Sequence, residues 1–526
     1  MKNIIHVSTL DEFLAAARSA AAGAVIRLEN GTHYLDHSLL FAGLRDLTLD
    51  FGGSTVKTQY DPTQYAYDPK RDTPASTDAF IFEECENLLV CNVTVTASVP
   101  TNVGGRITAV TATGKDMSGY VELALNDIHP RTGEELFLGG VNFGENWEQE
   151  RHFIGTHLGT QDNHALIAGE ISTSQPQRLN CENKVQVKEG ENVWRVPHQW
   201  KNVEVGQRCN EFHIYYGVAN FTYRNCVGMT MEDIRFTNAA GMGFVILPRC
   251  RDFTFRRIRV CADCPEQIPF AMTADGIHTT GLGGKFVMED CYFADLGDDP
   301  LNIHAVCLLV TKVEGNRVTA IFDKPYCQHP KRWAQAGDVL FVRDGKTLAD
   351  KGTLTVENYT DGLPYGDKEG IFTCAEVTFT TDSAVAAGDF ISNSAMYVDA
   401  EIRRNTFKGS KRVLTLQGIH SAVVEDNTFT DTYKSVYISS AYTFWSECGP
   451  AKNVTVRNNR FIRPHMPSVI VQIKEPDLTN LVPIHENITI EDNVIIDSDL
   501  DKNFELSFAE NLVVRNNIFV RCKVEE

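Results

Sequence analysis

The sequence predicts an all-β protein: a right-handed parallel β-helix with an N-terminal cap helix and two inserted small β-barrel-like domains. Three observations support this prediction. Short alternating strands recur along the chain, one amphipathic helix precedes them, and two stretches interrupt the recurrence. At 526 residues and 43% apolar, the chain is also too long for one compact domain unless its fold is extended or repetitive.

The amphipathic helix comes first. Ser8 is its expected N-cap, and Asp11 stands at the capping-box position. Its apolar stripe consists of Leu10, Phe13, Leu14 and Ala17. Because an uncapped stack of strands leaves a hydrophobic edge exposed, we expect this helix to cover one end of the stack.

The repeat is an alternating strand, a polar pair with Asn or another small residue, and an apolar pair. Its clearest copies are DAEIRRNTFKG (399–409), SAVVEDNTFTD (421–431), NITIEDNVIID (487–497) and NLVVRNNIFVR (511–521). Asn405 and Asn427 are 22 residues apart, and Asn493 and Asn517 are 24 apart. A period in the low twenties is one coil of a parallel β-helix. The Asn marks a tight turn where αL geometry is tolerated and stacked amides can form a ladder.

Two stretches lack the repeat and contain strands separated by turn residues, as in small antiparallel barrels. They divide the chain into five expected parts. These are the cap and first coils (1–104), an inserted β-barrel-like domain (105–200), the central β-helix (201–304), a second inserted β-barrel-like domain (305–393) and the C-terminal coils (394–526). Insertions on one face of a solenoid usually flank its binding face.

Composition excludes several classes of protein. The net charge of −20 and the lack of a basic cluster argue against a nucleic-acid partner. No segment approaches 18 unbroken apolar residues, so no membrane span is expected. The N-terminus lacks the features of a signal peptide, which predicts a cytoplasmic protein, or a secreted or periplasmic one if a leader was removed. The 14 cysteines are then expected to be reduced, and the lone CxxC at Cys261 does not predict a zinc site.

Acidic residues gather in the segment 273–304. Asp275 and Asp298 are 23 residues apart, which is one coil, so they should lie on adjacent stacked strands about 4.8 Å apart. Asp299 follows directly, and Gly297 permits a bulge or turn that brings both carboxylates to the outer groove. The expected result is a cluster of three carboxylates on the outside of the β-helix.

Such a cluster suits glycoside hydrolysis. One carboxylic acid protonates the leaving oxygen, while a second carboxylate activates water or attacks the sugar. Crowding of like charges raises at least one pKa, which keeps an acid protonated near neutral pH. Two alternatives stay open: three acidic residues in solvated turns, and a calcium site.

The same residues carry a family resemblance. The chain is similar to polygalacturonases and more closely resembles glycoside hydrolase family 110, the α-1,3-galactosidases. The motifs that carry the resemblance run in order between about residues 210 and 465. They are Gly241-Met242-Gly243-Phe244, Thr273-Ala274-Asp275 with His278, Asp298-Asp299 with Asn302 and His304, and Trp445-Ser446-Glu447-Cys448-Gly449.

The resemblance implies an exo-acting, inverting hydrolase that releases terminal α-1,3-linked galactose from an oligosaccharide or glycan. It implies that Asp275, Asp298 and Asp299 are catalytic, without a metal or an organic cofactor. One residue of the 298–299 pair would be the acid, and we choose Asp298, although coupled carboxylates share their titration. Gly276, after Asp275, departs from the family pattern.

Six further residues are candidates for binding the sugar: His278, Asn302, His304, Arg412, Trp445 and Glu447. The two histidines would hydrogen-bond hydroxyl groups or orient the acid, and the alternative for each is an ordinary core or groove histidine. Trp445 would stack on a sugar ring, unless it packs between coils. Arg412 would contact the sugar or offset the carboxylate charge.

Other functions remain open at this point. A lyase, an epimerase or a polygalacturonase-like hydrolase would use the same fold, but a lyase needs a metal or a basic residue to neutralise a uronate. A non-catalytic β-helix would bind glycans or assemble into a larger structure. A flat β-helix face is a common dimer surface, so a homodimer is a further expectation.

Overall fold

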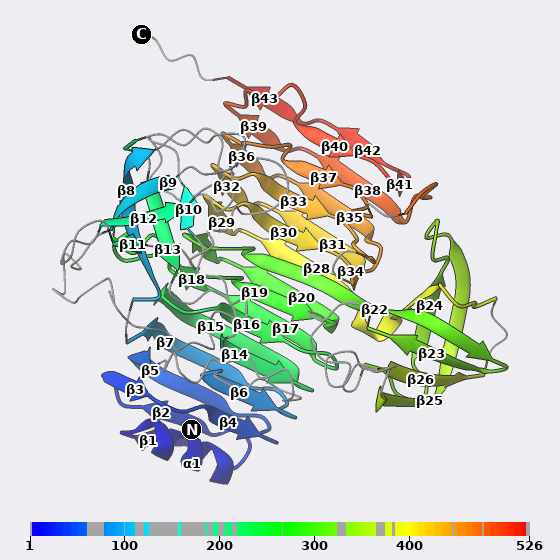
Figure 1. Ribbon diagram of the computed structural model, residues 1–526. Coiled ribbons are helices and arrows are strands. Elements are labelled where there is room, and N and C mark those ends of the chain that lie inside the picture. The colour runs from blue at the N-terminus through cyan, green and yellow to red at the C-terminus, as the bar shows by residue number, and fades with distance from the viewer. Residues whose placement is uncertain are drawn as a thin grey trace.

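The structure, a computed structural model, is a β-helix whose coils stack from the N-terminal to the C-terminal end (Figure 1). The described residues are 3–59, 78–98, 100–110, 120–125, 156–158, 185–186, 193–197, 205–206, 208–212, 218–265, 267–322, 333–363, 374–380, 384–443, 446–475 and 478–521. Consecutive coils pair in parallel in two long sheets, here called sheet A and sheet B. The predicted right-handed parallel β-helix is therefore confirmed.

Sheet A contains 21 strands and forms two sides of each coil. They are β1 (Ile4–Val7), β2 (Val25–Leu28), β3 (Thr32–Leu35), β5 (Thr48–Thr58), β7 (Leu89–Ala97), β15 (Val227–Asn238), β17 (Arg251–Arg256), β18 (Arg259–Val260), β20 (Gly283–Glu289), β21 (Tyr292–Ala294), β28 (Val398–Arg403), β29 (Thr406–Lys408), β31 (Ile419–Glu425), β32 (Thr428–Thr430), β35 (Lys452–Arg457), β36 (Arg460–Ile462), β38 (His485–Glu491), β39 (Val494–Ile496), β41 (Ala509–Glu510), β42 (Val513–Arg515) and β43 (Ile518–Val520).

Sheet B forms the third side of the coils, and its strands also follow one another in parallel. They are β4 (Leu39–Ala42), β6 (Phe80–Glu83), β14 (Ala219–Arg224), β16 (Met242–Ile246), β19 (Ile277–Thr280), β22 (Leu301–Glu314), β30 (Arg412–Leu416), β33 (Lys434–Ile438), β37 (Val469–Val471) and β40 (Phe504–Leu506).

The core between the sheets is a column of stacked side chains, because each coil places the same apolar position above that of its neighbour. Phe293, Phe407, Phe429 and Phe461 stack in this way, with ring centroids 4.9 to 5.9 Å apart. All four rings are fully buried. Aromatic pairs at such distances add about 0.5–1.5 kcal/mol each beyond the burial of their surface.

The helix α1 (Leu10–Ser19) covers the N-terminal end of this column, as expected. Phe13 is fully buried and packs its ring against Phe41 and Phe51. The expected cap was wrong by one residue: Thr9 is the N-cap and Glu12 completes the capping box. Thr9 accepts from the Glu12 N–H while the Glu12 carboxylate accepts in return, so the pairing that Ser8 and Asp11 would make is already satisfied. Among the described residues no helix is long and apolar enough to cross a bilayer.

The recurring asparagines form the predicted ladder inside the stack. The Nδ2 of Asn405 donates to Oδ1 of Asn427, at 2.9 Å, and the same bond runs on through Asn459 and Asn493 to Asn517. The αL geometry belongs to the residue before each of them, such as Asp426 (φ 57°) before Asn427. The turn residue bends the chain, and the next residue is left free to place its amide in the ladder.

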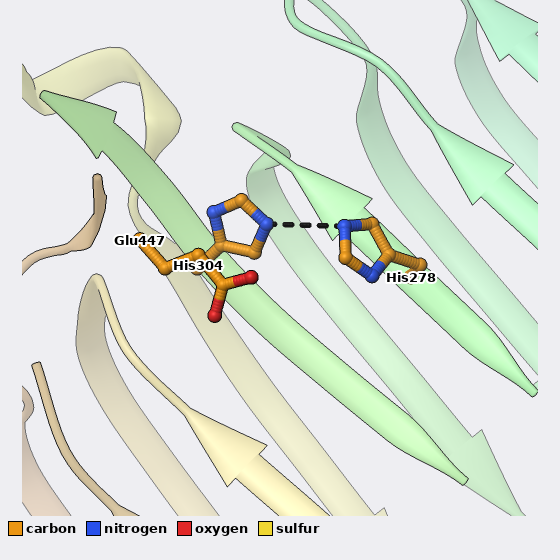
Figure 2. A group of neighbouring side chains, drawn as sticks. All are labelled: His278, His304 and Glu447. Carbon is orange, nitrogen blue, oxygen red and sulfur yellow. Dashed lines mark hydrogen bonds between the residues drawn. The ribbon is translucent and has the colours of Figure 1, made fainter. Parts of the chain in front are cut away.

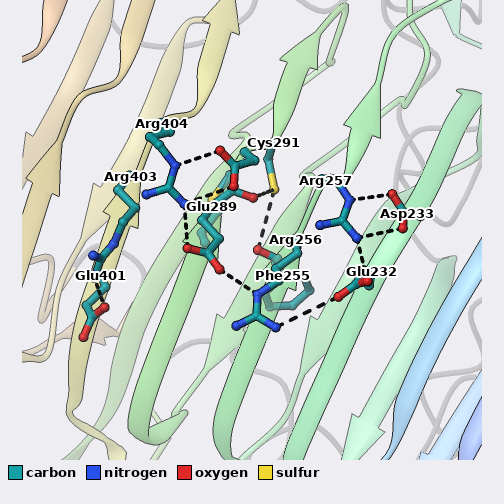
Figure 3. A network of polar contacts seen from close by, with 12 residues as sticks. Glu232, Asp233, Phe255, Arg256, Arg257, Glu289, Cys291, Glu401, Arg403 and Arg404 are labelled. Carbon is teal, nitrogen blue, oxygen red and sulfur yellow. Dashed lines mark hydrogen bonds and ion pairs between the residues drawn. The ribbon is translucent and has the colours of Figure 1, made fainter.

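Charged side chains line the outside of the same turns and pair between coils (Figure 3). Arg256 contacts Glu289 at 2.6 Å, and Arg404 contacts Glu289 and Asp290 at 2.8 Å. These groups are partly exposed, and each such pair contributes no more than about 1 kcal/mol. Their main effect is to favour one register between coils, because a shift would place like charges together.

Two antiparallel sheets interrupt the stack. In the second insertion β22 and β23 (Arg317–Ile321), β26 (Cys374–Phe379), β25 (Asp350–Leu363), β24 (Val339–Arg343) and β27 (Phe390–Asn393) pair in that order, and β27 pairs back with β22. This sheet closes on itself as a six-stranded barrel. β22 belongs to both structures, since it begins in sheet B and continues into the barrel (Figure 1).

The first insertion contains a six-stranded antiparallel sheet. Among the described residues its first and last strands do not pair with each other, so this sheet is open. Its strands are β10 (Thr156–Leu158), β13 (Arg208–Phe212), β8 (Asn102–Val110), β9 (Tyr120–Leu125), β12 (Val193–Pro197) and β11 (Val185–Gln186). The five boundaries expected from the sequence stay predictions.

The ladder predicts a large effect of a single amide. Asn427→Ala removes the acceptor of the Asn405 backbone N–H and one donor each to Oδ1 of Asn459 and to the carbonyl of Ile402. We expect a loss of about 2–4 kcal/mol, because buried polar groups left unpaired cost about 1–3 kcal/mol each. Thermal unfolding followed by circular dichroism measures it. Asn358→Ala, on the exposed surface of β25, is the control and should change the melting temperature little. Equal shifts in the two variants would contradict a stabilising ladder.

Candidate active site

The candidate site lies on the outer surface of sheet B, where β19, β22 and β30 are neighbours. Their register pairs Ile277 with Leu301 and Leu301 with Leu414, and these three side chains face the core. Because side chains alternate along a strand, the next residue of each strand faces outward. Those residues are His278, Asn302 and Thr415, which form one row across three coils.

The three aspartates come together at the start of these strands. Oδ1 of Asp275 accepts a hydrogen bond of 3.1 Å from the backbone N–H of Asp299. The coil at this point is 24 residues long, as the pairing of Ile277 with Leu301 shows. Asp275 is therefore aligned with Asp299, and the expected alignment with Asp298 was wrong by one residue. Asp298 and Asp299 both precede β22, outside its strict alternation, so their carboxylates can face the same side.

Arg412 joins the two adjacent carboxylates. Its Nε donates to Asp299 at 2.9 Å, and its Nη2 donates to Asp298 at 3.1 Å. The second oxygen of Asp299 accepts from the Thr415 hydroxyl at 2.8 Å. Arg412 and Thr415 both belong to β30, which lies beside β22 because the strands β23 to β27, which come between the two in the sequence, fold as a separate barrel.

Burial differs among the carboxyl groups. The side chain of Asp299 is fully covered, that of Asp275 is 6% exposed, and that of Asp298 is 17% exposed. Burial raises the pKa of Asp275 and of Asp299 well above the ordinary range, and the neighbouring charge of Asp298 raises both further. Arg412 acts in the opposite direction on both groups. The site thus holds carboxyl groups that bind protons more tightly than free aspartate does.

Gly276 is explained by crowding at this point. A Cβ atom there would lie 2.6 Å from the Phe293 ring and 2.6 Å from the carbonyl oxygen of Pro300. Those distances are too short for any side chain. The glycine at this position therefore follows from the close approach of the two coils that carry Asp275 and Asp299.

Two histidines extend the site along the same face (Figure 2). Nδ1 of His278 lies 2.6 Å from Oδ2 of Asp275, and its Nε2 lies 3.2 Å from Nε2 of His304. Nδ1 of His304 lies 3.0 Å from the backbone oxygen of Ala305. Burial lowers the pKa of both histidines, that of His304 to about 4.

Glu447 reaches this pair from a distant part of the chain. It lies on β34 (Glu447–Cys448), which pairs antiparallel with β22 where that strand leaves the stack, so that Val306 lies opposite Glu447. The carboxylate of Glu447 and the facing nitrogens of His278 and His304 lie within 4.8 Å of one another. The sequence analysis chose all three residues but did not predict that they meet. Trp445, also chosen, lies outside the described residues.

Several residues near the site were missed by the sequence analysis: Thr415, Gln417, Lys434, Tyr437 and Lys474. Arg412 and Lys434 are neighbours in the register of β30 and β33, and the ammonium of Lys434 lies 4.6 Å from the Tyr437 ring. Gln417 donates to Glu447 at 3.4 Å. The only sequence signal for them is the coil register, which the barrel insertion hides.

Two buried acceptors at the site have no hydrogen-bond partner among the described residues. They are Oδ1 of Asn302 and Oε1 of Gln417. Buried polar atoms are paired in the great majority of cases, so each exception needs an explanation. A bound molecule with hydroxyl groups would supply the missing donors.

A separate hollow of about 540 Å³ opens elsewhere, over sheet A. Its lining includes Arg27, Asp50, Asn92 and Arg235. Asp50 already pairs there with Arg27 and accepts from Asn92. The two carboxyl groups of its lining, Asp50 and Asp233, are each paired with an arginine, so the cluster of three aspartates on sheet B is the better candidate for catalysis.

Arg412 predicts a loss of stability that depends on pH. Burial raises the pKa of Asp275 and Asp299, and without Arg412 these pKa values rise further. A carboxyl group whose pKa is higher in the folded state favours folding at low pH and ceases to do so as the pH rises through that pKa. Arg412→Gln should therefore lower the melting temperature little near pH 4 and strongly near pH 7.5. At the higher pH the free energy of unfolding should fall by about 2 kcal/mol or more.

Melting curves at both pH values measure this difference. Arg412→Lys is the matched control, because it keeps the positive charge and should show a smaller dependence on pH. A loss of stability in Arg412→Gln that is the same at the two pH values would contradict the electrostatic role of the guanidinium.

Comparison with known proteins places these residues in a family context. No protein-family model matches the chain. Alpha-1,3-galactosidase B of Bacteroides thetaiotaomicron is 24% identical over 506 residues, which cover 92% of this chain and 76% of the relative. Alpha-1,3-galactosidase A of Bacteroides fragilis is 23% identical over 499 residues, with 92% and 75% covered.

Among solved structures, the polygalacturonase of Erwinia carotovora ssp. carotovora covers 99% of this chain and 95% of its own, with 9% identity and a TM-score of 0.44. That likeness is too distant to transfer a residue or an activity. The sequence relatives confirm the resemblance that the aspartate motifs carry: over nearly its whole length, this chain is related to proteins named alpha-1,3-galactosidase.

Proposed function

We propose that this protein is an exo-acting glycoside hydrolase that releases terminal α-1,3-linked galactose by inversion. The observation that carries the proposal is the cluster itself: Asp275, Asp298 and Asp299 meet on the outer face of sheet B around Arg412. The relatives named alpha-1,3-galactosidase support glycoside hydrolase activity and suggest the sugar and the linkage.

Asp298 is the proposed general acid. An acid must approach the oxygen of the leaving sugar, and Asp298 has the most exposed carboxyl group of the three. The Arg412 guanidinium holds one oxygen of Asp298 at 3.1 Å. That contact orients the carboxyl group.

Asp275 and Asp299 are the proposed pair that positions and activates the attacking water. Burial raises the pKa of each, which makes the ionised form a stronger base than ordinary aspartate. Each carboxylate oxygen retains a second lone pair after the bonds already described. The side chain of Asp299 is fully covered in this structure, so its role in activating water requires a side-chain movement that admits a water molecule. Attack by water opposite the leaving group inverts the anomeric centre.

The unpaired acceptors fit a sugar. Asn302, on β22, lies between His278 and Thr415 in the outward-facing row, and its Oδ1 is one of these acceptors. Gln417, which directly follows β30, is the next outward-facing residue after Thr415, and its Oε1 is the other. A galactose unit offers several hydroxyl donors on one ring. Hydrogen bonds to buried acceptors also discriminate strongly, because a sugar that lacks the hydroxyl leaves the acceptor unpaired.

Hydrolysis is the direct test. The purified protein is incubated with Galα1-3Gal and with other α- and β-galactosides, and the released sugar is followed by NMR. We expect β-galactose to appear first from the α-1,3 substrate. Asp298→Asn should lower kcat by about 10²–10⁴-fold, the usual contribution of a general acid.

Asp399→Asn is the matched control for that variant. Asp399 lies on β28 in sheet A, away from the cluster, and accepts only a surface contact from Ser421. It should keep full activity. No release from any galactoside, or equal activity in the Asp298 and Asp399 variants, would overturn the proposal. Release of α-galactose first would instead replace inversion with retention.

A second candidate is hydrolysis of an α-linked galacturonide. The specific observation in its favour is the pair Lys434 and Lys474, whose pKa values are lowered by burial and by the nearby Arg412, that of Lys474 to about 8. Positive groups at this place would neutralise the carboxylate of a uronate. Adding digalacturonate to the substrate panel separates the candidates, since Lys434→Met should impair only the hydrolysis of the acidic sugar.

A further inference from the structure

The two histidines of the site face each other with their ring nitrogens. Nε2 of His278 and Nε2 of His304 are 3.2 Å apart, and the rings meet at an interplanar angle of 74° (Figure 2). On its far side each ring is held through Nδ1, His278 by the carboxylate of Asp275 and His304 by the carbonyl of Ala305. The rings are therefore fixed in place from behind.

These partners decide where the ring protons are. A carbonyl oxygen can only accept, so His304 donates through Nδ1, and in the neutral ring its Nε2 carries a bare lone pair. An ionised Asp275 accepts from Nδ1 of His278 in the same way, whereas a protonated Asp275 would donate to Nδ1 and leave the His278 proton on Nε2. With Asp275 ionised, the two lone pairs face each other at 3.2 Å and repel, so a positive particle completes the pair. It is either one shared proton or a metal ion that touches both nitrogens.

The distance suits a metal ion of the zinc type. Zn²⁺ binds imidazole nitrogens at about 2.0–2.1 Å, and at a tetrahedral angle two such nitrogens lie roughly 3.3 Å apart. The observed 3.2 Å agrees with this separation. Nδ1 contacts to a carboxylate and to a backbone carbonyl are also what histidine ligands of metals usually make, because they fix the ring and raise its basicity.

Glu447 provides a third ligand. Its carboxylate and the two ring nitrogens lie within 4.8 Å of one another. A movement of about 1–2 Å would bring the carboxylate to zinc-binding distance. Such a movement is available to this partly exposed side chain, whose contact with Gln417 is long at 3.4 Å.

We propose that His278, His304 and Glu447 form a binding site for a divalent transition-metal ion, with Zn²⁺ as the reference ion and one coordination position open toward the surface. Two imidazoles and one carboxylate are typical of zinc sites that keep an open position. Mg²⁺ and Ca²⁺ prefer oxygen ligands alone, so they are not expected here. The sequence analysis expected no metal, and the separation of 143 residues between His304 and Glu447 hides this set of ligands from it.

The proposal goes beyond the proposed hydrolysis and does not depend on it, because ion binding is measured without a sugar. The protein is treated with a chelator, exchanged into metal-free buffer and titrated with Zn²⁺ by calorimetry. We expect one ion per chain with a Kd below about 10 μM. Titration with Co²⁺ should give the intense visible absorption of a tetrahedral complex.

Variants assign the ligands. His304→Asn and Glu447→Gln should each weaken Zn²⁺ binding by more than tenfold and abolish the Co²⁺ spectrum. Asp275→Asn should weaken binding by about 10–100-fold while the spectrum persists, since Asp275 only orients His278. His37→Asn removes an exposed histidine on the N-terminal coils, and Cys261→Ser removes the more exposed thiol of the CxxC. Both controls should bind as the unmodified protein does.

Melting curves of the metal-free variants show whether each is folded. The proposal is overturned if the unmodified protein binds no Zn²⁺ at micromolar concentration, which would mean that the histidines share a proton instead. It is also overturned if the ion remains bound at full affinity in both His304→Asn and Glu447→Gln. Inactivity toward every galactoside, with Zn²⁺ binding intact, would overturn the proposed hydrolysis alone.

Discussion

The parallel register between consecutive coils is the constraint on which the rest of the structure depends. Backbone pairing sets neighbouring strands about 4.8 Å apart, and this converts a sequence interval of one coil into direct contact. The amide ladder from Asn405 to Asn517 and the charge pairs outside it favour the same register. A slip of one residue would turn core side chains outward, so the register is strongly determined. Asp275 meets Asp299, and His278 meets Asn302, for that reason alone.

The site combines this register with an insertion. β22 begins in sheet B with Asn302 and His304, between β19 and β30, and then leaves the sheet to enter the barrel, where β34 pairs with its Ala305 and Val306. β30 contributes Arg412 and Thr415, and β34 contributes Glu447. The residues around the aspartates therefore come from segments more than a hundred positions apart, and the barrel is the element that makes room for them.

The pKa values of the aspartates in the site reflect two opposing effects, burial and the charge of one guanidinium. Burial raises the pKa of Asp275 and Asp299, which favours protonated or strongly basic carboxyl groups, while Arg412 limits that effect. The same carboxylate of Asp275 that accepts from the Asp299 backbone also holds His278. The aspartate cluster and the histidine pair are thus physically coupled through one side chain, so a change of charge in one alters the electrostatic environment of the other.

The sequence by itself determined the β-helix, the cap helix, the asparagine ladder and the meeting of the three aspartates. All of these follow from local periodicity, and periodicity is visible in a chain whose ladder asparagines recur every 22 to 24 residues, or every 32 to 34 where a coil is longer. Only the tertiary structure decided that Asp275 aligns with Asp299, that Arg412 joins the adjacent carboxylates, and that Glu447 meets the two histidines. The physical reason is that these contacts either join segments on the two sides of the barrel insertion or depend on a difference of one residue in the length of a coil. Sequence spacing cannot resolve either, because the chain leaves the stack after His304, folds as the barrel and re-enters the stack at Val398, a position that only packing determines.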